Sequence, residues 1–108
     1  MDDEFTGVEC PEPVEGLYFV YILVCANGSF YTGHTNCVGS RLARHAAGDG
    51  ARHTNILKPF KLVYTEGPVE MGEACKRERQ LKKWSRAKKR ALVEGDKDAL
   101  RGLSRSRD

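Results

Sequence analysis

The chain has 108 residues, of which 40% are apolar and 31% are charged, with a formal net charge of +3. This length suits one domain with a single modest core, and the composition is that of a globular protein. No apolar run approaches the ~20 residues that a membrane helix needs, and the acidic start lacks the basic region of a signal peptide, so we expect a cytoplasmic protein with no membrane association.

The charge is distributed unevenly along the chain. Residues 1–15 carry six acids and no bases, whereas residues 16–94 carry 14 Lys or Arg against six Asp or Glu, a net of +8. A basic folded part favours a polyanionic partner such as nucleic acid, although many basic domains only present solvated charged faces. We expect an acidic flexible tail over 1–15, one domain over 16–95 and a polar C-terminal tail over 96–108.

The first predicted elements form a β-hairpin. Residues 17–24 (LYFVYILV) are β-branched and aromatic, which is typical of a strand buried on both faces. Asn27-Gly28 follows and is a strong hairpin signal, because both residues tolerate positive φ. Residues 29–32 (SFYT) are the short return strand, which we expect Gly33 to end.

A helix is predicted over residues 37–47, with Thr35 or Asn36 as its N-cap and glycines 48 and 50 as its end. After a polar loop, residues 60–64 (FKLVY) alternate between apolar and polar and are predicted to be the third strand.

The C-terminal part of the domain is predicted to be helical. After Gly67-Pro68, one helix begins near residues 69–72 and ends near 83, and a second covers 86–94, with Ser85 as N-cap and Gly95 as its stop. The whole pattern predicts an α+β (α/β) fold in which about three helices flank a small three-stranded sheet.

Polar side chains with possible catalytic roles gather around the hairpin and the later helix. Tyr21 and Tyr31 lie on the two strands, and Arg41 and His45 lie one helical turn apart just beyond them. Arg41 falls on the inward stripe of its helix, and Glu78 falls among the apolar positions of the later helix.

Two interpretations of Arg41 and Glu78 remain open at this point. Because an uncompensated buried charge is very costly, they could pair with each other as a structural salt bridge. Alternatively, Glu78 could bind a hard divalent cation and Arg41 could stabilise charge on a phosphate. A tyrosine near such a metal and arginine can have its pKa lowered enough to act as a general base, although each tyrosine could equally be a core residue.

The cysteines favour reduced thiols rather than a metal centre. No C-x-x-C spacing occurs among the four, which are Cys10, Cys25, Cys37 and Cys75. A zinc site built from Cys25, Cys37, His34 or His45 is an alternative, but the usual close-spaced ligand pairs are missing.

Three segments follow one another along the chain, namely Val20-Tyr21-Ile22, Tyr31-Thr32-Gly33 and residues 40–45 (SRLARH). Together they resemble the GIY-YIG nuclease superfamily, above all its small stand-alone, single-domain bacterial members, and the likeness covers about residues 17–95. The resemblance implies an antiparallel three-stranded sheet flanked by helices. It also implies hydrolysis of DNA phosphodiester bonds with one divalent metal, usually Mg²⁺ with Mn²⁺ as an alternative.

The resemblance also implies roles for individual residues. Tyr21 would activate or position the attacking water, and Tyr31 would assist within the same site. Arg41 would neutralise the transition state, His45 would be the nearby histidine, and Glu78 would bind the metal.

The motifs depart from the family pattern at several positions. Phe19 replaces the glycine of the first motif, and Thr32 replaces the isoleucine of the second. The asparagine that several family nucleases carry near the end of the domain has no obvious match. His34, directly after the second motif, is expected to be a surface or capping residue, although it could join the site.

The later helices predict the contact with substrate. Between residues 76 and 90 nine residues are basic and only Glu78 is acidic. The residues expected to contact phosphates are Arg44, Arg52, Lys76, Arg79, Lys82, Lys83 and Arg86. The expected partner is DNA, with RNA as an open alternative, and weak sequence specificity suits DNA repair or processing. The competing hypothesis is a non-catalytic nucleic-acid-binding protein that retains the nuclease fold.

Overall fold

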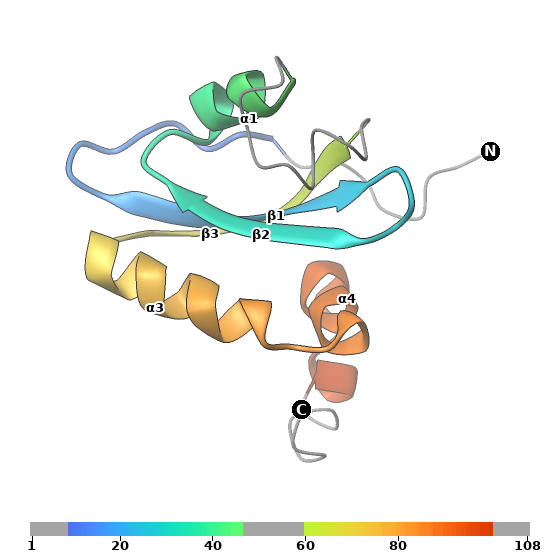
Figure 1. Cartoon of the computed structure of the whole chain (residues 1–108). Coiled ribbons are helices and arrows are strands. Elements are labelled where there is room, and N and C mark those ends of the chain that lie inside the picture. The colour runs from blue at the N-terminus through green and yellow to red at the C-terminus, as the bar shows by residue number, and fades with distance from the viewer. Residues whose placement is uncertain (1–8, 47–59, 101–108) are drawn as a thin grey trace.

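A computed structural model describes residues 9–46 and 60–100 of the chain (Figure 1). Strands β1 (Tyr18–Cys25), β2 (Phe30–Thr35) and β3 (Phe60–Val69) form one antiparallel sheet in the order β2-β1-β3. The central strand β1 is therefore hydrogen-bonded on both sides, which agrees with its unbroken apolar sequence.

Helices cover both faces of this sheet. Figure 1 shows α1 (Val38–Ala46) over one face, while α3 (Met71–Lys82) and α4 (Arg86–Glu94) lie against the other. The predicted α+β fold, a three-stranded antiparallel sheet flanked by helices, is confirmed. No helix within the described ranges is long and apolar enough to cross a bilayer.

The alternation of side chains along β1 divides the core between the two faces. Val20 and Ile22 pack with Ala74 and Leu81 of α3. Tyr21 belongs to the opposite cluster, with Phe19, Leu23, Val38 and Leu62. Tyr21 thus faces α1 although Glu78 lies on α3.

Two strands are longer than the sequence predicted. β2 does not end at Gly33 but continues to Thr35, because Gly33 pairs with Tyr21 and His34 with Val20 in register with β1. β3 runs past Tyr64 to Val69 and includes Gly67-Pro68, which was expected to be a loop. A proline is compatible with this edge strand, whose register with β1 shifts between Tyr18 and Val20.

The start of α4 tests the prediction that Ser85 is its N-cap. The Ser85 side chain accepts a hydrogen bond from the Lys88 backbone N–H at 3.1 Å, as the predicted N-cap should. We expect Ser85→Ala to lower the free energy of unfolding by about 1 kcal/mol in urea denaturation. Ser85→Thr retains a capping hydroxyl and should recover most of this loss, so equal destabilisation by both variants would contradict the capping role.

Candidate active site

Tyr21 is held across the edge strand by a glycine. Tyr21 and Gly33 are direct partners in the β1–β2 register, and Tyr21 is 0% exposed. A Cβ atom placed on Gly33 would lie 2.6 Å from the Tyr21 hydroxyl oxygen and 2.8 Å from Cζ. The Tyr21 ring therefore occupies the space that any side chain at position 33 would need.

Arg41 and Tyr31 surround the Tyr21 hydroxyl. The Arg41 side chain hydrogen-bonds to Tyr21, and the Tyr31 ring centroid lies 6.4 Å from that of Tyr21. Burial is the main reason that the pKa of Tyr21 is raised, and Tyr31 and Glu78 add to this effect while Arg41 opposes it. The expected lowering of the tyrosine pKa is therefore not produced by these protein groups, which keep Tyr21 a neutral phenol at neutral pH.

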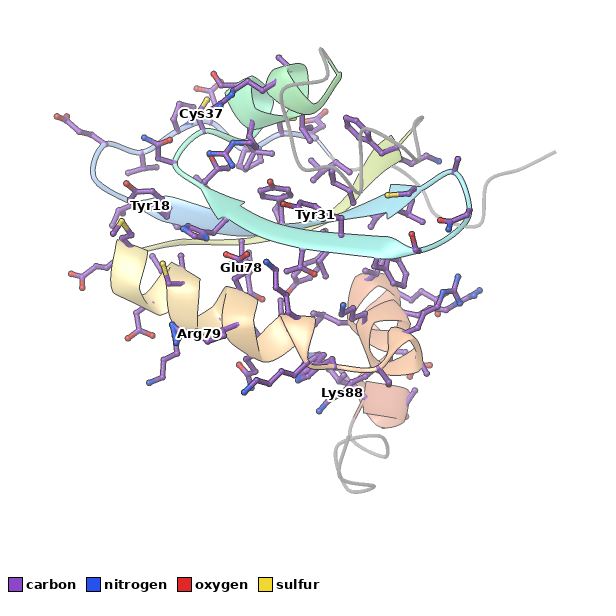
Figure 2. All side chains as sticks on the ribbon, in the orientation of Figure 1. Tyr18, Tyr31, Cys37, Glu78, Arg79 and Lys88 are labelled. Atoms are coloured by element: carbon purple, nitrogen blue, oxygen red, sulfur yellow. The ribbon has the colours of Figure 1, made fainter. Side chains whose placement is uncertain are left out.

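Glu78 lies on the face of the sheet opposite the Tyr21 side chain. Figure 2 shows its side chain projecting from α3 toward the sheet, where it is 15% exposed. One carboxylate oxygen contacts His34 Nδ1, and the other lies 2.7 Å from Lys82 Nζ. Burial raises the pKa of Glu78, but the hydrogen bonds from Lys82 and His34 outweigh burial and hold it below its ordinary value.

The structural salt bridge between Arg41 and Glu78 is not present among the described residues. Glu78 is paired with His34 and Lys82 instead, and Arg41 contacts Tyr21 on the α1 side of the sheet. The physical reason is the layer order, since α1 and α3 cover opposite faces (Figure 1). Arg41 lowers the pKa of Tyr21 and Glu78 raises it, although the two charged side chains lie on opposite sides of the sheet.

His34 joins this site, against the expectation of a surface or capping role. Its Nδ1 contacts Glu78, and its Nε2 lies 3.5 Å from the Cys75 sulfur, while the Tyr18 ring centroid is 6.1 Å from its own. The signal that could have found His34 is strand alternation. Once β2 continues through Gly33, His34 falls on the face opposite Gly33, which is the face that α3 covers.

The residues present fit a divalent cation held by a single carboxylate. No group of three or more His, Cys, Asp or Glu side chains converges on one point in the described ranges, so Cys25, Cys37 and His34 do not form the zinc site considered above. Glu78 offers ionised oxygen atoms, and Mg²⁺ commonly binds one or two carboxylates while retaining several waters. The Lys82 side chain is 52% exposed, so it can move away from Glu78 without giving up contacts in the core.

The predicted phosphate-contacting residues separate into different environments. Lys82 lies at Glu78, whereas the Arg86 guanidinium donates to the Gly28 carbonyl at 2.9 Å and lies over the Phe30 ring. Arg44 is exposed on α1. The exposed cations on the outer side of α3 are Lys76, Arg79 and Lys83. Arg52 lies outside the described residues, as does the side chain of His45.

The geometry can be compared with known proteins at this point. The family model of the GIY-YIG catalytic domain matches residues 17–91, well over half of the chain. The chain belongs to the GIY-YIG catalytic domain family. This is a nuclease superfamily, whose members act on nucleic acids and generally use divalent metals.

Similar proteins are small and largely consist of this domain. UPF0213 protein SAV0488 of Staphylococcus aureus is 42% identical over 76 residues, which cover 70% of this chain and 93% of that protein. The solution NMR structure of the E. faecalis protein EF2693 is 33% identical with a TM-score of 0.56, and the match covers 79% of this chain and 90% of the other.

A second solution NMR structure, of UPF0213 protein BH0048 from Bacillus halodurans, is 42% identical with a TM-score of 0.49 and covers 74% of this chain and 85% of the other. None of these three names states an activity. The GIY-YIG assignment therefore rests on the family match and on sequence identity, and the roles of single residues rest on the geometry above.

Proposed function

We propose that this GIY-YIG domain is a metal-dependent endonuclease that hydrolyses DNA phosphodiester bonds with little sequence specificity. The observation that carries the proposal is that Arg41 and Glu78 both act on Tyr21, one from each face of the sheet. Arg41 hydrogen-bonds to the buried Tyr21, and the ionised Glu78 is close enough to raise the pKa of Tyr21 from the other face. A cation-binding carboxylate, a phosphate-neutralising guanidinium and a phenol together suit phosphodiester hydrolysis.

The chain's own residues have distinct roles in this proposal. Tyr21, held neutral by burial, orients the attacking water through its hydroxyl, and the Arg41 guanidinium stabilises negative charge that develops on the phosphate. Tyr31 packs beside Tyr21 and limits its movement. Magnesium bound to Glu78 would polarise a phosphate oxygen and lower the pKa of coordinated water.

Lys82, which is paired with Glu78, and the nearby Lys89 support a polyanionic substrate. The pKa of Lys89 is lowered by burial and by the nearby Lys82, so two ammonium groups lie close enough to repel each other. A phosphate near these two cations would offset this repulsion. The described residues include no helix with base-reading signatures, and such phosphate contacts position DNA without reading its sequence, which suits DNA repair or processing.

One observation favours the non-catalytic alternative. Both carboxylate oxygens of Glu78 already have cationic or imidazole partners in the chain, as a purely structural glutamate would. In that case the domain would bind nucleic acid through its basic faces without cutting it. The two functions differ in one measurable respect, which is cleavage that requires a divalent cation.

Replacing Arg41 tests the proposal. Wild-type protein should cut at least one of plasmid, linear duplex, single-stranded or branched DNA with Mg²⁺ or Mn²⁺. Arg41→Ala should lower the cleavage rate about 10²-fold or more, because a preorganised donor to the developing charge is lost.

Arg44→Ala is the matched control, since it removes the same charge from an exposed position on the same helix. This variant should weaken DNA binding modestly and leave the rate at saturating DNA almost unchanged. Equal loss of rate in both variants, or no metal-dependent cutting of any substrate by wild-type protein, would favour the binding protein instead.

A further inference from the structure

The outer side of α3 and α4 forms a basic pocket away from the candidate active site. The pocket has a volume of about 440 Å³ and is lined by Lys76, Arg79, Gln80, Lys83, Trp84 and Lys88. Figure 2 shows that Arg79 and Lys88 lie on the side of α3 away from the sheet, whereas Glu78 points toward it. The basic residues of α3 therefore serve two separate surfaces.

The cations of this pocket have no acidic partner among the residues that the structure describes. Within residues 9–46 and 60–100, none of Lys76, Arg79, Lys83 and Lys88 forms an ion pair with a carboxylate. Lys88 is only 7% exposed, and its ammonium group lies 4.2 Å from the centroid of the Trp84 ring. A cation–π contact compensates part of the cost of burying this charge, but an anion would compensate more.

The surroundings of Trp84 favour a phosphate ligand over a nucleobase stacked on the indole ring. Lys88 and Arg77 both lie over the indole, with Arg77 Cζ at 5.2 Å from the ring centroid. The ring therefore already contacts two cations, and their charge favours an anionic group beside the ring. Three further cations line the pocket, and they are Lys76, Arg79 and Lys83. Their spacing of three and four residues along the helix places them close enough together to contact neighbouring phosphates of one strand.

We propose that this pocket is a second phosphate-binding site, which takes backbone phosphates of a nucleic-acid segment other than the one at the candidate active site. The proposal goes beyond cleavage, because it concerns a surface on the opposite side of α3 from Glu78. It also explains why the pocket cations have no carboxylate partner within the described residues, whereas Arg77 is paired with Glu66 and Lys82 with Glu78. Such a site would raise affinity for long or folded nucleic acids without contributing to the reaction.

Trp84 provides a specific readout, because it is the sole tryptophan of the chain. Titration of the full chain with the single-stranded oligonucleotide dT12 should change Trp84 fluorescence to saturation, since a phosphate at Lys88 alters its contact with the indole. The midpoint should agree with the Kd from anisotropy of labelled dT12. Thymidine 5′-monophosphate and inorganic phosphate are titrated beside it.

The variants Arg79→Gln and Lys83→Gln should each raise the Kd of dT12 roughly 3- to 10-fold and lower the salt slope by about 0.7. Lys97→Gln is the matched control, because it removes one charge from an exposed position outside the pocket. It should change the Kd less than 2-fold. Lys88→Met, which keeps the aliphatic stem, should abolish the fluorescence change while dT12 still binds by anisotropy.

The probes distinguish the sources of phosphate. A midpoint at least 10-fold lower for dT12 than for the mononucleotide, at equal phosphate concentration, supports a polynucleotide backbone, and equal midpoints support a site for single phosphate groups. The proposal is overturned if Trp84 fluorescence responds to none of the three probes, or if the pocket variants change the Kd no more than Lys97→Gln does. It is also overturned if the fluorescence changes only with an acidic peptide of equal charge, titrated as a further probe. Cleavage is measured separately. If the protein cuts DNA but Trp84 fluorescence does not change, the second phosphate site has failed; if the fluorescence changes but no DNA is cut, the proposed nuclease activity has failed.

Discussion

Gly33→Ala is expected to destabilise the protein and to disable the candidate site together. A Cβ atom at this position would lie 2.6 Å from the Tyr21 hydroxyl oxygen and 2.8 Å from Cζ, which are separations that must be relieved by movement. Tyr21 is fully buried and belongs to the cluster on the α1 side, so its ring has little room to move. Overpacking of this kind costs about 1–3 kcal/mol, measured as the free energy of unfolding in urea.

The same displacement should lower the cleavage rate more than 10²-fold. Tyr21 is hydrogen-bonded to Arg41, so a shift of its ring moves both proposed catalytic groups. A misplacement of about 1 Å can reduce an enzymatic rate by this amount. The stability result does not depend on the proposed function and can be measured even if no substrate is cut.

Gly72→Ala is the matched control for this substitution. Gly72 lies in α3 without positive φ, and beyond its chain neighbours and the helix's own backbone no atom lies within 4 Å of the position where its Cβ would be. Alanine there should stabilise the protein by up to about 1 kcal/mol through helix propensity. Similar stability changes at positions 33 and 72 would contradict the steric account of the Tyr21–Gly33 pair.

Local sequence patterns were sufficient for most of the fold. The hairpin follows from Asn27-Gly28 between two apolar runs, and α4 follows from Ser85 as N-cap and Gly95, whose φ of 73° suits a helix end. The ends of β2 and β3 were wrong because glycine and proline were interpreted as stops. Pairing with the central strand β1 overrides these local signals.

The candidate site was only partly predictable for a related reason. The inward positions of Arg41 and Glu78 follow from helical periodicity, but which groups they meet depends on the layer that each helix occupies. His34 was expected at the surface because its strand was predicted to end at Gly33, whereas β2 continues to Thr35. The division of the α3 cations between Glu78 and the outer pocket likewise depends on how α4 packs, which a single sequence does not specify.

Glu78→Gln should have the largest effect on cleavage. The amide is close in size to the carboxylate but lacks the negative charge that a hard divalent cation requires. Loss of metal assistance of about 4 kcal/mol corresponds to a rate reduction of roughly 10³-fold. Calorimetric titration with Mn²⁺ should show a loss of binding in parallel with the loss of cutting.

Glu73→Gln is the matched control, because Glu73 is an exposed carboxylate on the same helix. It removes the same charge and should change the cleavage rate less than 2-fold. If Glu73→Gln and Glu78→Gln reduce Mn²⁺ binding equally, the cation is attracted by general charge and Glu78 is not its ligand.

The pH dependence of stability separates a metal ligand from a merely structural glutamate. The pKa of Glu78 is lowered in the folded protein, so its contacts with Lys82 and His34 stabilise the fold above the unfolded pKa of about 4.3. This stability is lost as the pH falls through the lower, folded pKa. Without metal, wild type should therefore be more stable than Glu78→Gln at pH 7, and the difference should shrink as the pH falls below about 4.3 and vanish only below the folded pKa. A stability difference at pH 7 without any change in cleavage or Mn²⁺ binding would make Glu78 a structural residue, whereas loss of all three supports its role in the nuclease site.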